Sequence, residues 1–481
     1  MRCLICFLAF YFSTNIFGYS QDVALKFAVN QESKQIKKQT YSFSNTINND
    51  LAILVRERKN SVAFLYDKHF KAKSKFDFIF KKKSKYNTVL GEKIVGSQYS
   101  LLYANRLKNK FCVFTVDFST NSSSLKELKI NFKNERYLKT IAHKNKLYLL
   151  SFLRADNEII IRELNDAYEF ELIKSHALEL DKNQKLYTPD SSINNFWNTV
   201  QPDVVTIDNR IPNSIEQVSE NNKIYVQNDS LYITFDNTTE STLMYVINLI
   251  NFSINKIKFD YPKGRIAKFE KYNSYFFDNK LFQIASSRKE VLFEVKNLNN
   301  DILKSYYFDK GTPIDIKNSP IIQDGQTAIP FVNKREFEET SKFLRKISSG
   351  NLGISVYKKD DFYHITIGGV KQVIYSNPAP MIMGGPTVVT INNQVHLFNA
   401  PNPVFASYQS FKSSKSTYFN TKLDLDFNYV EAVVDKNIFE NIEEFHDRLN
   451  NVSGEAVFFH SKHLYFSYFD AENSEFNLVK F

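Results

Sequence analysis

A short pattern of polar and apolar residues recurs along the chain. Two or three residues of Asn, Asp, Lys or Ser precede an apolar run that usually contains an aromatic residue. Copies occur at residues 59–62, 108–111, 144–148, 228–232, 278–282, 359–363, 392–395 and 461–465. Because Asn and Asp tolerate the left-handed backbone conformations of tight turns, each copy predicts a β-hairpin turn followed by a strand.

Further strands follow most copies of this pattern. Apolar, β-branched or aromatic runs occur at 158–161, 243–247 and 291–295, and a third strand is predicted at 254–259. Several copies are 33–50 residues apart, and two gaps are close to twice that spacing. Each unit is therefore interpreted as a four-stranded antiparallel sheet of about 40 residues.

This repeated unit resembles the blade of β-propeller repeat proteins, although it matches no specific propeller family. The resemblance covers most of residues 41–481 and implies an all-β fold of about seven four-stranded blades with a few inserted helices. The last unit offers only three strands, at 455–459, 464–469 and 476–481. We expect an N-terminal strand, near 22–29 or 40–43, to supply the fourth strand and close the ring.

Two stretches interrupt the repeat within a predicted single domain spanning 21–481. Residues 179–222 contain three prolines and are predicted to form a long loop. Residues 331–450 are predicted to be a helix-containing insertion. Its first helix should begin at an Asn333 cap, with Glu336 three residues later, and end at Gly350; its second should begin at an Asn437 cap with Glu440 three residues later.

The N-terminus has the pattern of a secretory signal peptide. Residues 1–20 carry Arg2, a short apolar run and small residues before a predicted cleavage between Ser20 and Gln21. No later segment is apolar for long enough to predict a membrane-spanning helix. We therefore expect an exported protein that is periplasmic, on the cell surface or extracellular. The mature chain would keep one cysteine, Cys112, predicted to be a buried, unreactive thiol.

Positive charge is concentrated near the N-terminus. The whole chain has a net charge of +10, yet residues 21–140 contain 24 basic and 10 acidic residues. The centre of this sector, residues 68–85, is a candidate for binding an anionic surface, a glycan or a protein; nucleic acid is not favoured as the partner. The candidate residues are Lys71, Lys73, Lys75, Lys81, Lys82, Lys83 and Lys85. The alternative is a solvated outer strand whose lysines prevent aggregation through its edge.

The sequence offers few other candidate sites. Phe196 and Trp197, in the predicted long loop, are candidates for stacking on a ligand such as a sugar; alternatively they anchor the loop. His460 and His463 fall in a predicted turn and are interpreted as surface histidines. No motif or spacing indicates catalytic residues, a metal site or a cofactor.

These observations favour a secreted or periplasmic, non-enzymatic binding or scaffolding module whose ligand is unknown. Two alternatives stay open. One is an outer-membrane β-barrel, suggested by the aromatic-rich strands and the terminal Phe481. The other is a propeller enzyme acting on polysaccharide, which would place two or three carboxylates with perturbed pKa values around the central channel.

Overall fold

The computed structural model describes residues 22–481 with several gaps. The gaps are 31–36, 59, 81–84, 131, 133, 154, 181–186, 190–199, 203, 237, 239, 325–333, 371–387, 392–393, 398–401 and 413–415. The predicted signal peptide therefore lies outside the described residues, as do Lys81, Lys82, Lys83, Phe196 and Trp197.

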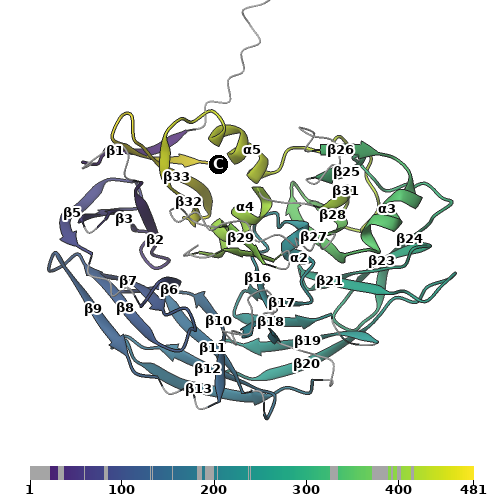
Figure 1. Cartoon of the computed structure of the whole chain (residues 1–481), viewed down its shortest axis with the longest axis horizontal. Helices are drawn as coiled ribbons and strands as arrows, with labels where there is room; N and C mark the ends of the chain where they lie inside the picture. The colour runs from purple at the N-terminus through teal and green to yellow at the C-terminus, as the bar shows by residue number, and fades with distance from the viewer. Residues whose placement is uncertain are drawn as a thin grey trace, which may run out of the picture.

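Seven sheets of four or five strands account for most of the described chain, and they follow one another around a ring (Figure 1). Four of them run in sequence order from the inner to the outer strand. The first contains β2 (Gln39–Ser44), β3 (Leu51–Glu57), β4 (Asn60–Tyr66) and β5 (Ala72–Ile79). The second contains β6 (Thr88–Val95), β7 (Gln98–Ala104), β8 (Phe111–Asp117) and β9 (Ser122–Leu128). The third contains β10 (Glu135–His143), β11 (Lys146–Leu153), β12 (Glu158–Leu164) and β13 (Phe170–Ala177). The fifth contains β21 (Lys271–Phe277), β22 (Lys280–Ser286), β23 (Glu290–Lys296) and β24 (Ile302–Asp309).

The fourth and sixth sheets each have five strands. The fourth adds the short parallel strand β16 (Val205–Ile207) to β17 (Asn222–Gln227), β18 (Ser230–Phe235), β19 (Ser241–Asn248) and β20 (Ile254–Asp260). The sixth has the order β26 (Lys334–Phe337), β25 (Ile321–Asp324), β31 (Thr417–Leu423), β28 (Phe362–Val370) and β27 (Asn351–Lys359). Two short hairpins are separate from the seven sheets: β14 (Tyr187–Pro189) with β15 (Val200–Pro202), and β29 (Val388–Ile391) with β30 (Gln394–Leu397).

The seventh sheet closes the ring, and it confirms one of the two expected closures. It contains β32 (Val452–His460), β33 (His463–Asp470), β34 (Glu475–Lys480) and the N-terminal strand β1 (Val23–Ala28). Phe27 on β1 lies opposite Phe476 on β34, and their rings stack at 4.9 Å. The other expected strand, near 40–43, belongs instead to β2 in the first sheet.

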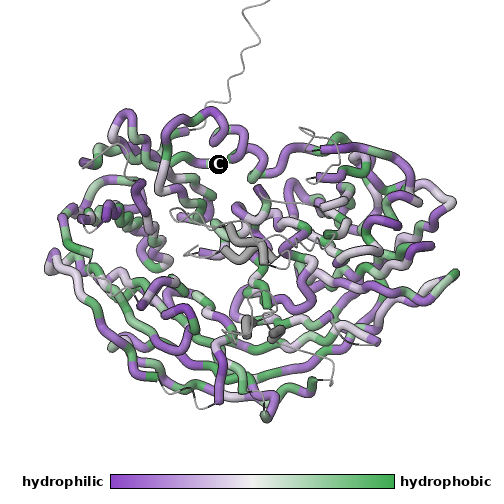
Figure 2. Tube along the Cα trace, in the orientation of Figure 1, coloured by the Kyte–Doolittle hydropathy of each residue, from purple (hydrophilic) through white to green (hydrophobic). Residues whose placement is uncertain are grey.

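The hydrophobic core is a series of interfaces between neighbouring sheets rather than one central cluster. One cluster joins the first and second sheets, another the third and fourth, and a large one joins the fourth, fifth and sixth. In Figure 2 the hydrophobic stretches run along the strands in the body of the ring. A strand in a sheet that is packed between two neighbouring sheets is buried on both faces. This explains why Ile159, Ile160 and Ile161 are consecutive apolar residues. Cys112 is buried in one of these interfaces, as predicted.

Within the described residues the recurring polar pattern forms hairpin turns, as predicted; residues 392–393 of the copy at 392–395 lie outside them. In four of them, at 144–145, 278–279, 360–361 and 461–462, both turn residues have positive φ, which matches the twist of the flanking strands. The turns do not occupy one place in the repeat. They join the first two strands in the third, fifth and seventh sheets but the second and third strands in the first two sheets, which explains the uneven spacing.

Four helices fall in the described residues: α2 (Ile215–Val218), α3 (Thr340–Ile347), α4 (Pro403–Lys412) and α5 (Ile438–His446). Asn437 is the N-cap of helix α5, as predicted. The predicted start of the first helix of the insertion, at an Asn333 cap, was wrong. Residues 334–337 form β26, and α3 begins only at Thr340. Helices α4 and α5 pack against the seventh sheet, on the side facing the sixth (Figure 1).

Candidate functional site

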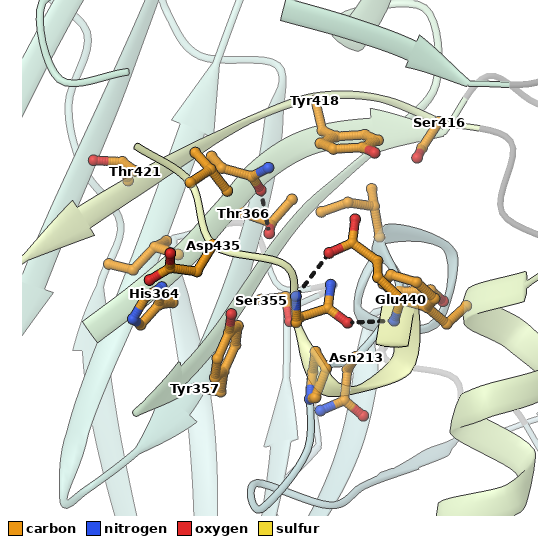
Figure 3. Close-up of a pocket in the computed structure, with 18 of the residues that line it drawn as sticks. Asn213, Ser355, Tyr357, His364, Thr366, Ser416, Tyr418, Thr421, Asp435 and Glu440 are labelled. Carbon is orange, nitrogen blue, oxygen red and sulfur yellow. Dashed lines mark hydrogen bonds between the residues drawn. The ribbon is translucent and has the colours of Figure 1, made fainter. Parts of the chain in front are cut away.

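A cavity of about 300 Å³ lies between the sixth sheet and the start of α5. Strands β27, β28 and β31 form one side of it, and the segment 433–437 together with α5 forms the other (Figure 3). Residues 212–215, at the start of α2, complete the wall. The cavity thus occupies the place where the ring is widened by the helices between its sixth and seventh sheets.

Two stacked rings form one wall of the cavity. The tight turn at 360–361 pairs Tyr357 on β27 with His364 on β28, and their rings stack at 5.0 Å with an angle of 16° between their planes. Burial, together with Lys422 and Lys359, lowers the pKa of His364, so the imidazole is neutral at pH 7. Burial and the nearby Glu440 and Asp435 raise the pKa of Tyr357, so its hydroxyl keeps its proton.

The opposite wall is held in place by a capping box at the start of α5. The Asn437 Oδ1 accepts hydrogen bonds from the backbone N–H groups of Phe439 and Glu440, at 2.9 and 3.1 Å. The Glu440 Oε2 in turn accepts the Asn437 N–H at 2.7 Å (Figure 3). Upstream, the Asn318 Nδ2 donates to the carbonyls of Val430 and Ala432, both at 2.9 Å. This wall is therefore organised without a ligand.

Strand β31 contributes Tyr418, Asn420 and Thr421. The Thr366 Oγ1 donates to the Asn420 Oδ1 at 2.8 Å, which ties β28 to β31. Thr421 is only 2% exposed, and its Oγ1 has no hydrogen-bond partner among the described residues. Close approach of the strands depends on Gly368, where an added Cβ would lie 2.3 Å from the Thr417 carbonyl oxygen.

The structure separates the sequence-predicted site residues from this cavity. Lys71 is exposed just before β5, and Lys73 and Lys75 lie along that strand, the outermost of the first sheet. The Lys73 Nζ lies 2.6 Å from the Asp50 Oδ2, and the Lys75 Nζ lies over the Phe64 ring. Lys85 pairs with Glu127 at 3.3 Å. Phe76, Phe78 and Phe80 face the other way, into the core between the first two sheets.

The interpretation of His460 as a surface residue was wrong. His460 is the last residue of β32, it is 1% exposed, and its Nδ1 lies 2.9 Å from the Ser44 Oγ of the first sheet. His460 is buried because Ser44 and Phe70 of the first sheet, together with Tyr465 of its own sheet, enclose the imidazole where the ring closes. His463, three residues later, is exposed as predicted.

Two groups with perturbed pKa values lie on neighbouring innermost strands. Burial raises the pKa of Glu92 on β6 to about 8, and burial together with Lys108 lowers the pKa of Lys139 on β10 to about 8. Of the acidic groups in the described residues, only Glu92 and Glu443 have raised pKa values, and Glu443 lies on α5. Among the described innermost strands, Glu92 is thus the carboxyl group with a raised pKa.

The described part of the chain holds no group of three or more metal-ligating side chains. No helix among the described residues combines the length and the apolar character that crossing a bilayer takes. Asp424 begins a turn after β31, where its Oδ1 accepts hydrogen bonds from the N–H groups of Asp426 and Asn428.

Sequence reasoning missed the cavity residues Tyr357, His364 and Tyr418. One signal was present, since the Asp360-Asp361 turn determines that Tyr357 lies opposite His364. The Asn437 and Glu440 motif was recognised as a helix start, but nothing in the sequence placed that start beside the sixth sheet.

Comparison with known proteins identifies no family for this chain. No known family matches the sequence, and no curated protein does. Among solved structures, a member of the DUF4221 family from Bacteroides vulgatus is 7% identical over 95% of this chain and 98% of that chain, with a TM-score of 0.32. A variant of Synechocystis apocarotenoid oxygenase is 7% identical over 58% of this chain and 63% of that chain, with a TM-score of 0.28. The chain spans about three fifths of the length of such oxygenase structures.

At such low identities and scores these likenesses carry no ligand or activity to this chain. The described structure is that of an all-β, propeller-like protein, with seven antiparallel sheets and few helices.

Proposed function

We propose that this protein is a binding module whose ligand, a small polar molecule, occupies the cavity between the sixth sheet and α5. The observation that carries the proposal is a cavity of about 300 Å³ whose walls are already organised by strand pairing and a capping box. That size is at the lower end of small-molecule sites. Aromatic rings beside polar groups are the usual lining of such sites.

A thermal-shift screen of small polar metabolites tests this function. A ligand that binds only the folded protein raises its stability by about 2.7 kcal/mol at a hundred times its dissociation constant. Replacing Tyr357 with Ala removes one ring of the cavity and should weaken such a ligand about tenfold or more. Tyr429→Ala is the matched control, since Tyr429 is also half-buried but lies outside the cavity. A ligand indifferent to Tyr357→Ala would place binding elsewhere.

The basic segment supports a second proposal, that the outer edge of the first sheet contacts an anionic surface. Lys71 and Lys73 are exposed on or beside the outermost strand, within the sector that carries most of the positive charge. Changing Lys71, Lys81, Lys82 and Lys83 to Glu should abolish salt-sensitive sedimentation with phosphatidylserine vesicles. Lys258→Glu with Lys304→Glu, on the outermost strands β20 and β24, is the control. Binding that survives the first set would leave these lysines as a solvated edge.

We also propose that the protein is exported, because residues 1–20 have the pattern of a cleaved signal peptide. Intact mass measurement of the protein from its native cells should show a chain beginning at Gln21. A chain that retains residues 1–20 would contradict this.

A further inference from the structure

The lysines that line the cavity are already engaged with other groups. The Lys334 Nζ lies 3.8 Å from the Asp324 Oδ2. The Lys412 Nζ lies 3.1 Å from the His446 Nδ1, and the Lys422 Nζ lies 4.1 Å from the centre of the Phe362 ring. Each ammonium group thus has a partner.

Two acidic residues of the cavity form no ion pair among the described residues. Asp435 lies on the segment before α5, and Figure 3 shows it beside the Tyr357 and His364 rings. Glu443 lies one turn into α5, where burial and Asp447 raise its pKa despite the opposing effect of Lys412 and Lys334. A cation brought close to Glu443 would favour its ionised form.

One further group that lines the cavity, the Thr421 hydroxyl, can accept or donate a hydrogen bond. The buried Thr421 Oγ1 is unpartnered among the described residues and lines the cavity. Nearby carboxylates help to raise the pKa values of both tyrosines. Glu440 and Asp435 do so for Tyr357, and Asp324 and Glu440 do so for Tyr418. The cavity therefore combines aromatic rings, a buried hydroxyl without a partner and carboxyl groups that form no ion pair among the described residues.

We propose that the ligand is a small organic cation, an amine or a guanidinium compound, that binds between Tyr357 and Tyr418 with its charged group toward Asp435. This rests on the proposed function and adds the class of ligand. Cations bind to the faces of tyrosine rings, and they form charge-assisted hydrogen bonds with carboxylates. Val433, 86% exposed at the rim, is placed to cover an aliphatic portion of the ligand.

Titration calorimetry with four probes tests the class. Agmatine and choline represent the cations, N-acetylglucosamine a neutral sugar and citrate an anion. At least one cation should bind with a dissociation constant below about 1 mM, while the sugar and citrate bind at least about tenfold more weakly. Asp435→Asn, at an exposed position, should weaken the cation about fivefold or more. The matched control is Glu444→Gln, because Glu444 is exposed on α5 and pairs with Lys436 outside the cavity.

The outcomes separate this inference from the proposed function. No heat with either cation up to about 10 mM, or a cation affinity unchanged by Asp435→Asn, overturns the choice of a cation. If the sugar or citrate binds instead and Tyr357→Ala abolishes that binding, the cavity is a binding site but the ligand class is wrong. If neither the four probes nor the metabolite screen yields a ligand sensitive to Tyr357→Ala, both proposals fail.

Discussion

At the scale of single residues, this chain builds its turns largely without glycine. The described residues include 22 non-glycine positions with positive φ, against two glycines, Gly96 and Gly454. Asn and Asp occupy more than half of the 22, which follows from their tolerance of the left-handed region. The low glycine content therefore coexists with many tight turns, and it is the Asn and Asp residues that make the hairpins predictable from sequence.

A residue-scale prediction concerns His460 and pH. Burial lowers the pKa of His460 below its usual 6.5, and nearby Asp50 opposes this only in part. The unfolded chain binds this proton more readily, so the contribution of His460 to stability is complete above about pH 6.5 and falls as the pH decreases below that value. The free energy of unfolding, measured with urea, should fall between about pH 7 and about pH 5. His460→Gln should make that fall smaller than in the unchanged protein.

His463→Gln is the control for this experiment, since His463 lies three residues away and is exposed. The His460 variant should itself be less stable at pH 7 by about 1 kcal/mol, because the contact with Ser44 is lost. An unchanged difference between the two pH values in His460→Gln would contradict this role.

At the scale of elements, sequence reasoning succeeded where a local signal decides the structure. The capping motif at Asn437 and the turn at 360–361 act over a few residues, and both were readable. The start of α3 could not be predicted from local sequence. Residues 334–337 pair with β25, and the position of β25 depends on β31, which is distant in the sequence. The sixth sheet takes its strands out of chain order, and no local pattern records that order.

An element-scale prediction concerns the capping box. Asn437→Ala removes the side chain that accepts two N–H groups of α5, so the free energy of unfolding should fall by about 1 kcal/mol. The same change should weaken a cavity ligand, since Glu440 would lose its fixed position. Asn441→Ala, one turn later, should change neither quantity appreciably. Equal effects of the two substitutions, in urea unfolding and in ligand titration, would contradict this account.

At the scale of the whole molecule, the fold is a ring closed by its two ends. The repeat in the sequence predicted about seven sheets and a closure by an N-terminal strand, because each sheet must bury both faces against its neighbours. It left residues 22–29 and 40–43 as alternatives for that strand, and the structure shows the first. The candidate site could not be predicted in the same way. It forms where the sixth sheet departs from the repeat, and its residues come from segments between 212 and 443.

Closure of the ring predicts that the last strand is indispensable. Deleting residues 476–481 removes Phe476, Leu478 and Val479, all fully buried, and leaves β1 without a partner. Losses of about 2–5 kcal/mol for each large side chain would together be comparable to the total stability of a typical domain. The truncated protein should show no cooperative thermal transition by circular dichroism, whereas Lys480→Ala should melt close to the unchanged protein. An unaltered melting temperature after truncation would refute the closure.

The central claim is that the cavity beside α5 binds a small organic cation. The most direct measurement is a crystal structure of the protein soaked with agmatine. The account predicts electron density for agmatine between Tyr357 and Tyr418, with its charged group within hydrogen-bond distance of the Asp435 carboxylate. An empty cavity at a saturating agmatine concentration, or agmatine bound only elsewhere on the molecule, would contradict it.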